Sequence, residues 1–431
     1  MKRRVEIGLL YSRSGTYRLI SESCRLGALR AIADLNADPA SEIELVPVER
    51  DPLGNTDRYA VLCEEILRNS RARHILGCTT SWSRKETIPV LEKLGGTLWY
   101  GCPYEGFEAN DHVVYMHACP NQHLVPLLAH VVPRFGANGF LLGSNYIWGW
   151  ETNRVARDLI ADAGGKVLGE RYLPIGETDI GRLIAEIRAT RPDFVLNNLI
   201  GTSSYAFIAA YAQLGREDAH FRPERCPLLS CNLSECELPA VGAAGDGHLS
   251  AGPYFWQELK APPHPPSASL GRPLPAGERR SARLAPPSTD QVEGEARTLT
   301  TSSPQRGEVA RAKRRAGEGD LATPQIAPAS SFEASAYASV QVLAKVLATR
   351  PDAAFADLPA IFAARRFETI LGGIAIDPRT QHATLPVEIG RIASGNSFAV
   401  ISRSEGVAPD PYLSHYDRAV TFAHPRLKVV S

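Results

Sequence analysis

Residues 77–108 decide the fold and read GCTTSWSRKETIPVLEKLGGTLWYGCPYEGFE. A short apolar run precedes this stretch, and the apolar positions of a predicted helix within it end at Gly95-Gly96. A second apolar run, 97–100, then ends at Gly101. Four hydroxyl residues lie at the start of the helix: Thr79, Thr80, Ser81 and Ser83. This order of strand, polar turn, helix and strand predicts a βαβ unit of a parallel sheet.

The two strand ends of this unit are candidate binding positions. Ligands of open parallel sheets lie beyond the carboxyl ends of the strands. Ser81 lies where a helix start presents unpaired backbone N–H groups, so its hydroxyl and those groups suit a carbonyl oxygen. Serine is also a favoured N-cap residue, so capping alone is the alternative for Ser81 and Ser83.

The same alternation of strands and helices continues along the chain. Predicted strands cover 5–11, 43–49, 113–117, 140–142, 166–173, 194–199, 228–230, 250–255, 367–376 and 385–392. Predicted helices cover 22–36, a segment after 55–57, 151–162, 179–190 and a segment from 332. This rhythm predicts an α/β fold with doubly wound parallel sheets, and a second α/β series begins after a break at 118–122.

Several motifs together resemble one known family. GC-x-x-S-x-x-RK is followed by Y-x-x-PYEGFE within 77–108. Further matching pieces are Arg50-Asp51-Pro52, Asp57-Arg58-Tyr59, Pro120-Asn121-Gln122, 143–147 and Asp410-Pro411-Tyr412. In order and spacing they resemble the amide- and urea-binding branch of the type I periplasmic-binding-protein fold. The AmiC-like amide sensors of aliphatic amidase operons are most similar, and urea-binding components of ABC transporters come second.

The resemblance implies two doubly wound parallel-sheet lobes around a hinged cleft. Lobe one would comprise 1–118, 250–258 and 329–370, and lobe two would comprise 119–249 and 371–431. The implied ligand-binding residues are Thr79, Ser81, Tyr100, Cys102, Pro103, Tyr104, Tyr146 and Trp148. Three positions depart from the family pattern, because Cys102 replaces a threonine, Thr79 replaces an aromatic residue, and 148–150 lacks the usual Pro-Arg.

Tyr100 and Tyr146 end strands in different predicted lobes. Alone, each is typical of a packed aromatic residue with a satisfied hydroxyl. As a pair, they would cover the two faces of a flat amide when the lobes close. The ligand NH₂ group would then find its acceptor among the backbone carbonyls near Cys102 or a tyrosine hydroxyl.

The segment 259–328 differs from the rest of the chain. It is dense in Pro, Arg, Ser, Gly and Ala, and no aromatic residue occurs between Trp256 and Phe332. It cannot bury enough apolar surface to offset the entropy of ordering, so we expect a disordered insertion. The basic run 311–315 fits a nucleic-acid patch in isolation, but a solvated loop is the favoured interpretation.

Composition and the N-terminus bear on the class and compartment. Lys+Arg and Asp+Glu both number 47, so no global charge favours nucleic acid or an anionic membrane. The apolar run after Lys2-Arg3-Arg4 is shorter than a secretory h-region. We therefore expect a cytoplasmic protein, or a periplasmic one if the start is misassigned. No stretch approaches the length of a membrane span.

Eight cysteines are expected to be reduced thiols rather than a disulfide framework. Cys231 and Cys236 fit zinc-ligand spacing loosely, but no histidine pair follows them, so no metal or other cofactor is expected. The sequence contains no Ser-x-x-Lys, Gly-x-Ser-x-Gly, His-Glu-x-x-His or P-loop motif, which indicates a binding protein rather than an enzyme.

Two functions remain open on these grounds. The first is a ligand sensor for short-chain amides or urea-like molecules, in which cleft closure controls a regulatory partner; the resemblance implies an RNA-binding antiterminator. The alternative is the substrate-binding subunit of an ABC-type importer for urea, amides or branched-chain amino acids. A homodimer is compatible with either function.

Overall fold

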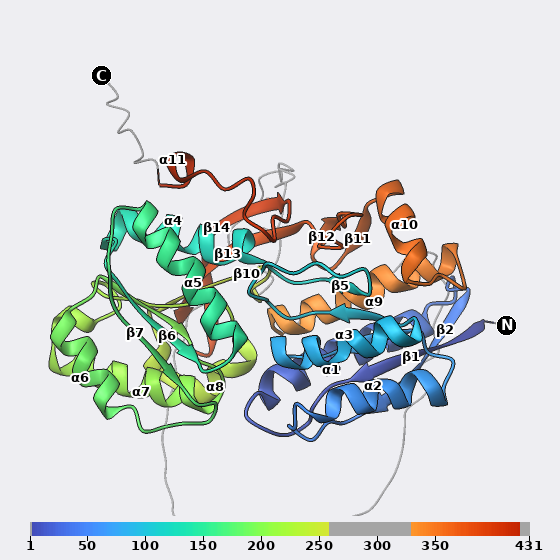
Figure 1. Ribbon diagram of the computed structural model, residues 1–431, viewed down its shortest axis with the longest axis horizontal. Helices are drawn as coiled ribbons and strands as arrows, with labels where there is room; N and C mark the ends of the chain where they lie inside the picture. The colour runs from blue at the N-terminus through green and yellow to red at the C-terminus, as the bar shows by residue number, and fades with distance from the viewer. Residues whose placement is uncertain (1, 258–328, 423–431) are drawn as a thin grey trace, which may run out of the picture. The chain divides into compact units, whose positions relative to one another are not determined.

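The computed structural model describes residues 2–257 and 329–422 (Figure 1). The insertion expected at 259–328 lies outside these described residues.

The first lobe is built on a parallel sheet with strand order β2-β1-β3-β4-β5. Its strands are β1 (Arg3–Leu10), β2 (Ile43–Arg50), β3 (His74–Gly77), β4 (Thr97–Tyr100) and β5 (Val113–Tyr115). Its helices are α1 (Arg18–Ala37), α2 (Arg58–Asn69), α3 (Ser81–Leu94), α9 (Ser331–Thr349) and α10 (Leu358–Ala364). Helix α9 lies beside α1, although some 290 residues separate them, and α2 packs on α3 (Figure 1).

Local sequence signals set both ends of α3. Thr80 is the N-cap, and its side chain accepts a hydrogen bond from the Ser83 N–H at 3.1 Å. The Ser83 hydroxyl in turn accepts from the Thr80 N–H at 3.1 Å, which completes a reciprocal capping box. At the other end Gly95 adopts φ +70°, a left-handed conformation that favours glycine. The predicted helix stop is therefore confirmed.

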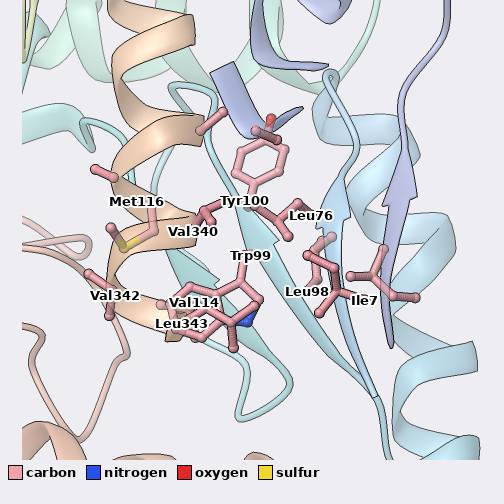
Figure 2. Close-up of a cluster of buried hydrophobic side chains, with 14 of the residues drawn as sticks. Ile7, Leu76, Leu98, Trp99, Tyr100, Val114, Met116, Val340, Val342 and Leu343 are labelled. Carbon is pink, nitrogen blue, oxygen red and sulfur yellow. The ribbon is translucent and has the colours of Figure 1, made fainter. Parts of the chain in front are cut away.

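The core of the first lobe joins the sheet to α9. Figure 2 shows Leu76, Leu98 and Trp99 of the strands near Val340 and Leu343 of α9. All five are at most 1% exposed. Burying side chains of this size stabilises the fold by about 1.5–3 kcal/mol each. Helix α9 is thus an integral part of the lobe, even though it follows the segment outside the described residues.

The second lobe contains a seven-stranded sheet with order β14-β13-β10-β9-β8-β6-β7. Its strands are β6 (Gly139–Ser144), β7 (Val167–Leu173), β8 (Phe194–Asn198), β9 (Leu228–Ser230), β10 (Leu249–Gly252), β13 (Leu385–Ala393) and β14 (Ser397–Val407). Its helices are α4 (Leu124–Phe135), α5 (Ile147–Asp162), α6 (Gly181–Thr190), α7 (Thr202–Glu217), α8 (Leu238–Val241) and α11 (Arg418–Thr421). Strands β6 to β10 are parallel, as expected, whereas β13 and β14 add antiparallel pairs at one edge.

Three details differ from the expectations. Residues 249–252 pair with β9 and β13 in the second sheet, so the chain leaves lobe two only after them rather than at residue 250. Residues 371–383 stay with the first lobe, where His382 forms a bridge to Tyr115 of β5. The single strand expected at 367–376 is a hairpin of β11 (Phe367–Thr369) and β12 (Gly372–Ile374). Its turn includes Gly372 at φ +88°, which a continuous strand would not adopt.

The expected fold class is confirmed: two α/β lobes, each with a parallel sheet, are formed by one chain that passes between them more than once.

Candidate functional site

A cavity of about 30 Å³ lies at the carboxyl ends of strands from both sheets. It is lined by Ile20, Thr79, Ser81, Tyr100, Cys102, Pro103, Tyr146, Trp148, Ile200, Asn232 and Phe332. Seven of the eight residues expected at a ligand site therefore surround one cavity. The eighth, Tyr104, does not line it; its hydroxyl is bonded to Glu108 O at 2.9 Å and to His382 Nε2 at 2.6 Å.

Several residues that line the cavity lie at or just after the carboxyl ends of strands. Thr79 follows β3, Tyr100 is the last residue of β4, and Tyr146 follows β6. Ile200 and Asn232 follow β8 and β9 in the second lobe. This is the edge at which open parallel sheets bind ligands.

The backbone before Thr79 is held in a sparsely populated conformation. Cys78 has φ +63°, which is uncommon for a non-glycine residue, and its N–H donates to Leu10 O at 3.1 Å. The Thr79 carbonyl accepts from the Tyr100 hydroxyl at 3.1 Å. The Tyr100 hydroxyl proton is therefore bonded within its own lobe, and Tyr100 lines the cavity.

Ser81 is the first residue of α3 and not its cap, which is Thr80. The Ser81 hydroxyl donates to Glu105 Oε2. Because a carboxylate that is paired with an arginine only accepts hydrogen bonds, the Ser81 proton is bonded to Glu105 in this structure and the Ser81 oxygen is left to accept a hydrogen bond. The predicted donation from Ser81 to a ligand carbonyl would need this hydrogen bond to be exchanged.

A buried ion network supports Ser81. The Arg84 guanidinium, 0% exposed, donates to Glu105 at 2.9 Å and to Glu108 at 2.7 Å. It also lies over the rings of Tyr100 and Tyr104, 4.8 Å and 5.0 Å from their centroids. Burial raises the pKa of Glu108, but the charges and hydrogen bonds of Arg84 and Lys85 together outweigh burial, and the pKa falls to about 2. The charge of Arg84 is thus balanced by Glu105 and Glu108, and Arg84 does not line the cavity.

Among the described residues that line the cavity, one polar group lacks a partner. The buried Trp148 indole Nε1 has no hydrogen-bond partner in the part of the chain that the structure describes, whereas the Thr79 side chain interacts with the Tyr59 hydroxyl. The indole N–H is a donor only. Buried polar groups are normally satisfied, so this donor is a candidate to bind a ligand.

Sequence reasoning missed four lining residues: Ile20, Ile200, Asn232 and Phe332. The rule of strand ends was a usable signal for Ile200 and Asn232, because they follow the predicted strands 194–199 and 228–230. Ile20 and Phe332 come from the packed helices α1 and α9, and no local pattern places them at the cavity.

All eight cysteines are free thiols in the structure, Cys231 and Cys236 included. In the described part of the chain, no cluster of His, Cys, Asp or Glu side chains is arranged to hold a metal ion. Within residues 2–257 and 329–422, no helix combines the length and apolar character that a membrane span requires.

A small cavity between the strand ends of two α/β lobes defines a two-lobed ligand-binding protein. The family model described as "Periplasmic binding protein domain" matches residues 5–263 and 309–418. The chain therefore belongs to this family, whose members are binding proteins and not enzymes.

Solved structures with the same fold include substrate-binding proteins of ABC transporters. One is the solute-binding protein from Rhodopseudomonas palustris HaA2 in complex with p-hydroxybenzoic acid (16% identity, TM-score 0.68, covering 94% of this chain and 98% of that one). Another is a periplasmic binding protein from Burkholderia mallei (15% identity, TM-score 0.69, covering 94% and 95%). A third is the branched-chain amino acid transporter substrate-binding protein from Streptococcus pneumoniae in complex with isoleucine (12% identity, TM-score 0.65, covering 94% and 100%).

Proposed function

We propose that this protein binds a small, uncharged amide, such as a short-chain aliphatic amide or urea. The observation that carries the proposal is the pairing of a free donor, Trp148 Nε1, with an oriented acceptor, Ser81 Oγ, at one cavity. A primary amide offers one carbonyl acceptor and one NH₂ donor group, which complement this pair. Tyr100 and Tyr146 add apolar ring surface from the two lobes.

The size of the cavity supports a ligand of few atoms. A cavity of roughly 150 Å³ accommodates benzene, whereas this one measures about 30 Å³. An aromatic acid of the kind held by the Rhodopseudomonas protein would need a substantially wider arrangement of the lining.

The charge of the lining supports a neutral ligand. Of the described residues that line the cavity, none carries a formal charge. A carboxylate or an amino-acid zwitterion buried there would lack an ionic partner, which is costly. Arg84 does not change this, because Glu105 and Glu108 already pair with it.

The proposed role is that of a substrate-binding subunit of an ABC-type importer. The solved structures with this fold support this role, because several are substrate-binding proteins of such transporters. In this role a permease would be the partner, and closed, ligand-loaded protein would be the form that it recognises.

A second candidate is a cytoplasmic amide sensor that controls an RNA-binding antiterminator. One observation favours it: the buried Cys24 and Cys102 sulfur atoms lie 3.7 Å apart as a hydrogen-bonded pair of thiols and not as a disulfide. Cysteines so close normally pair in an oxidising compartment and stay reduced in a cytosol. Cell fractionation with thiol labelling separates the roles, since a reduced cytosolic pool supports the sensor and an exported pool supports the importer.

The proposal is tested by calorimetry with formamide, acetamide, butyramide and urea, set against p-hydroxybenzoate and isoleucine. We expect binding of at least one neutral amide and weaker or undetectable binding of the two charged compounds. Trp148→Phe keeps an aromatic ring but removes the indole N–H, so it should weaken amide binding by about 1–3 kcal/mol. Binding of the charged compounds alone, or full amide affinity in Trp148→Phe, would overturn the proposal.

A further inference from the structure

A second cavity, larger than the ligand cavity, lies in the first lobe. It measures about 480 Å³, within the range of roughly 300–1,000 Å³ that small-molecule sites occupy. It opens at the amino-terminal ends of β1 and β3, whereas the cleft residues follow the carboxyl ends of strands. Its lining comprises Arg3, Arg4, Val5, Glu6, Val46, Arg71, Arg73, His74, Leu347, Pro351, Asp352 and Ala353.

Four arginines converge on this cavity because two neighbouring strands begin there. Arg3 and Arg4 open β1, while Arg71 and Arg73 immediately precede β3. Strands β1 and β3 pair in parallel, with Gly8 opposite Ile75, so the residues just before β3 run along the first half of β1, and the Arg71 N–H donates to Glu6 there at 2.7 Å. Two short basic sequences, remote in the chain, thereby form one positively charged wall.

Most of this positive charge has no ionic partner. Among the described residues, Arg3 donates only to Leu347 O at 3.1 Å, and Arg73 donates only to carbonyl oxygens, one being Ala72 O at 2.8 Å. The Arg71 side chain has no hydrogen bond or ion pair among these residues. Arg4 alone approaches a carboxylate, that of Glu44, at 3.8 Å.

The acidic side chains of the lining do not cancel the arginines. There are two, Glu6 and Asp352, against four guanidinium groups. Glu6 also accepts the Arg71 backbone N–H at 2.7 Å. Burial lowers the pKa of His74 to about 4, and its Nε2 contacts Ala353 O at 3.0 Å, so His74 is neutral at pH 7.

We propose that this arginine cavity is a second binding site, which takes a small molecule carrying at least two phosphate groups. Guanidinium groups bind phosphate oxygens through paired, charge-assisted hydrogen bonds. Arg3, Arg71 and Arg73 have no ionic partner among the described residues, and three such groups carry more positive charge than one phosphate group neutralises. The site lies on the first lobe alone and shares no lining residue with the ligand cavity. It therefore does not depend on the proposed amide function.

The test is calorimetry and thermal unfolding of the full chain with inorganic pyrophosphate, ADP and inorganic phosphate. We expect pyrophosphate and ADP to bind and to raise the unfolding temperature, and inorganic phosphate to bind more weakly. Arg71→Gln combined with Arg73→Gln should weaken pyrophosphate binding by about tenfold or more, because hydrogen bonds to charged groups are among the stronger ones. Acetamide or urea binding should be unchanged in this variant.

The matched control is Arg134→Gln combined with Arg182→Gln. Both are exposed arginines of the second lobe without an ion pair among the described residues, and the control changes net charge equally. If both double variants lost pyrophosphate binding equally, the loss would follow from net charge and not from this cavity, and the inference would be overturned. It would also be overturned if neither pyrophosphate nor ADP bound at millimolar concentration, or if only an acidic peptide did.

Discussion

A distant contact decides the role of a single hydroxyl at this site. Ser81 is the first residue of α3, and a serine at a helix start is commonly expected to cap the helix. Its hydroxyl instead donates a hydrogen bond to Glu105, which lies 24 residues further along the chain. The hydroxyl oxygen is left to accept a hydrogen bond at the cavity that Trp148, the free donor, also lines.

Removing this hydroxyl should weaken ligand binding. In Ser81→Ala the ligand N–H group loses its acceptor away from water, so the binding free energy should fall by about 1–3 kcal/mol. Calorimetry with the best-bound amide measures the change. Ser339→Ala is the control, because its buried hydroxyl bonds within α9 to Ser335 O and lies outside the cavity lining. Wild-type affinity in Ser81→Ala would remove Ser81 from the site.

The sequence predicted which residues line the candidate cavity better than it predicted their hydrogen bonds. Thr79, Tyr100 and Tyr146 were predictable because polar or aromatic residues at the carboxyl ends of parallel strands gather at one edge. Phe332 was not, because its position depends on α9 packing beside α1 across the whole lobe. The direction of the Ser81 hydrogen bond also depends on a tertiary contact, which residue spacing does not reveal.

At the scale of elements, Arg84 joins α3 to the segment that follows β4. Its bonds to Glu105 and Glu108 help to hold this segment against the helix, together with the bonds from Ser81 to Glu105 and from Lys85 to Glu108. Breaking one partner of a buried network is far more costly than breaking a surface pair, since charges stay behind without compensation.

Arg84→Met should therefore destabilise the fold by about 3–5 kcal/mol. Denaturant unfolding monitored by circular dichroism measures the free energy of unfolding. Arg171→Met on β7 is the control: its ion pair with Glu186 lies at the surface, so the loss should stay within about 1 kcal/mol. Similar losses in both variants would contradict the structural role of the Arg84 network.

The elements that sequence reasoning missed are those with weak local patterns. Strand β14 is largely exposed at the sheet edge, so it lacks the apolar run that marks the inner strands. The β11–β12 hairpin was merged into one strand because Ile370 and Leu371 continue the apolar run up to its turn. In contrast, β9 (Leu228–Ser230) was predicted with the observed bounds, because its short apolar run is followed by polar residues.

At the scale of the whole molecule, buried histidines should control stability toward acid. Burial lowers the pKa of five of them to about 3–4: His74, His117, His123, His248 and His382. The unfolded chain binds protons at these positions below about pH 6.5, whereas the native state does not. Their contribution to stability is therefore present above pH 6.5 and is lost as the pH falls toward 4.

Three buried carboxyl groups act in the opposite direction. Burial raises the pKa of Glu235 and Glu237 to about 7, so their contribution is present below about pH 4.5 and is lost as the pH rises toward 7. Burial also raises the pKa of Glu388, which acts in the same direction. Five histidines outweigh three carboxyl groups, so the free energy of unfolding should fall between pH 6.5 and pH 5. Urea titrations across this range measure it. Glu237→Gln should make the loss steeper, and a gain of stability on acidification would refute the argument.

The cavity is lined by residues of both lobes, so ligand binding is expected to favour closure of the two lobes. Tyr146 belongs to the second lobe and Tyr100 to the first, yet both line one cavity. A ligand can shift the lobes toward a closed arrangement only through affinity that differs between open and closed forms. Contacts from Tyr146, which exist only when the lobes meet, would supply that difference.

Tyr146→Ala should therefore reduce both ligand affinity and ligand-induced compaction. The ligand contacts of the first lobe, from Ser81 and Tyr100, would remain, whereas those of the second lobe would be fewer. Small-angle scattering with and without the amide measures compaction, and calorimetry measures affinity. Tyr172→Ala, on β7 and outside the cavity lining, is the control. If Tyr146→Ala bound weakly yet compacted fully at saturating ligand, closure would depend on other second-lobe contacts, with Trp148 and Asn232 the next to substitute.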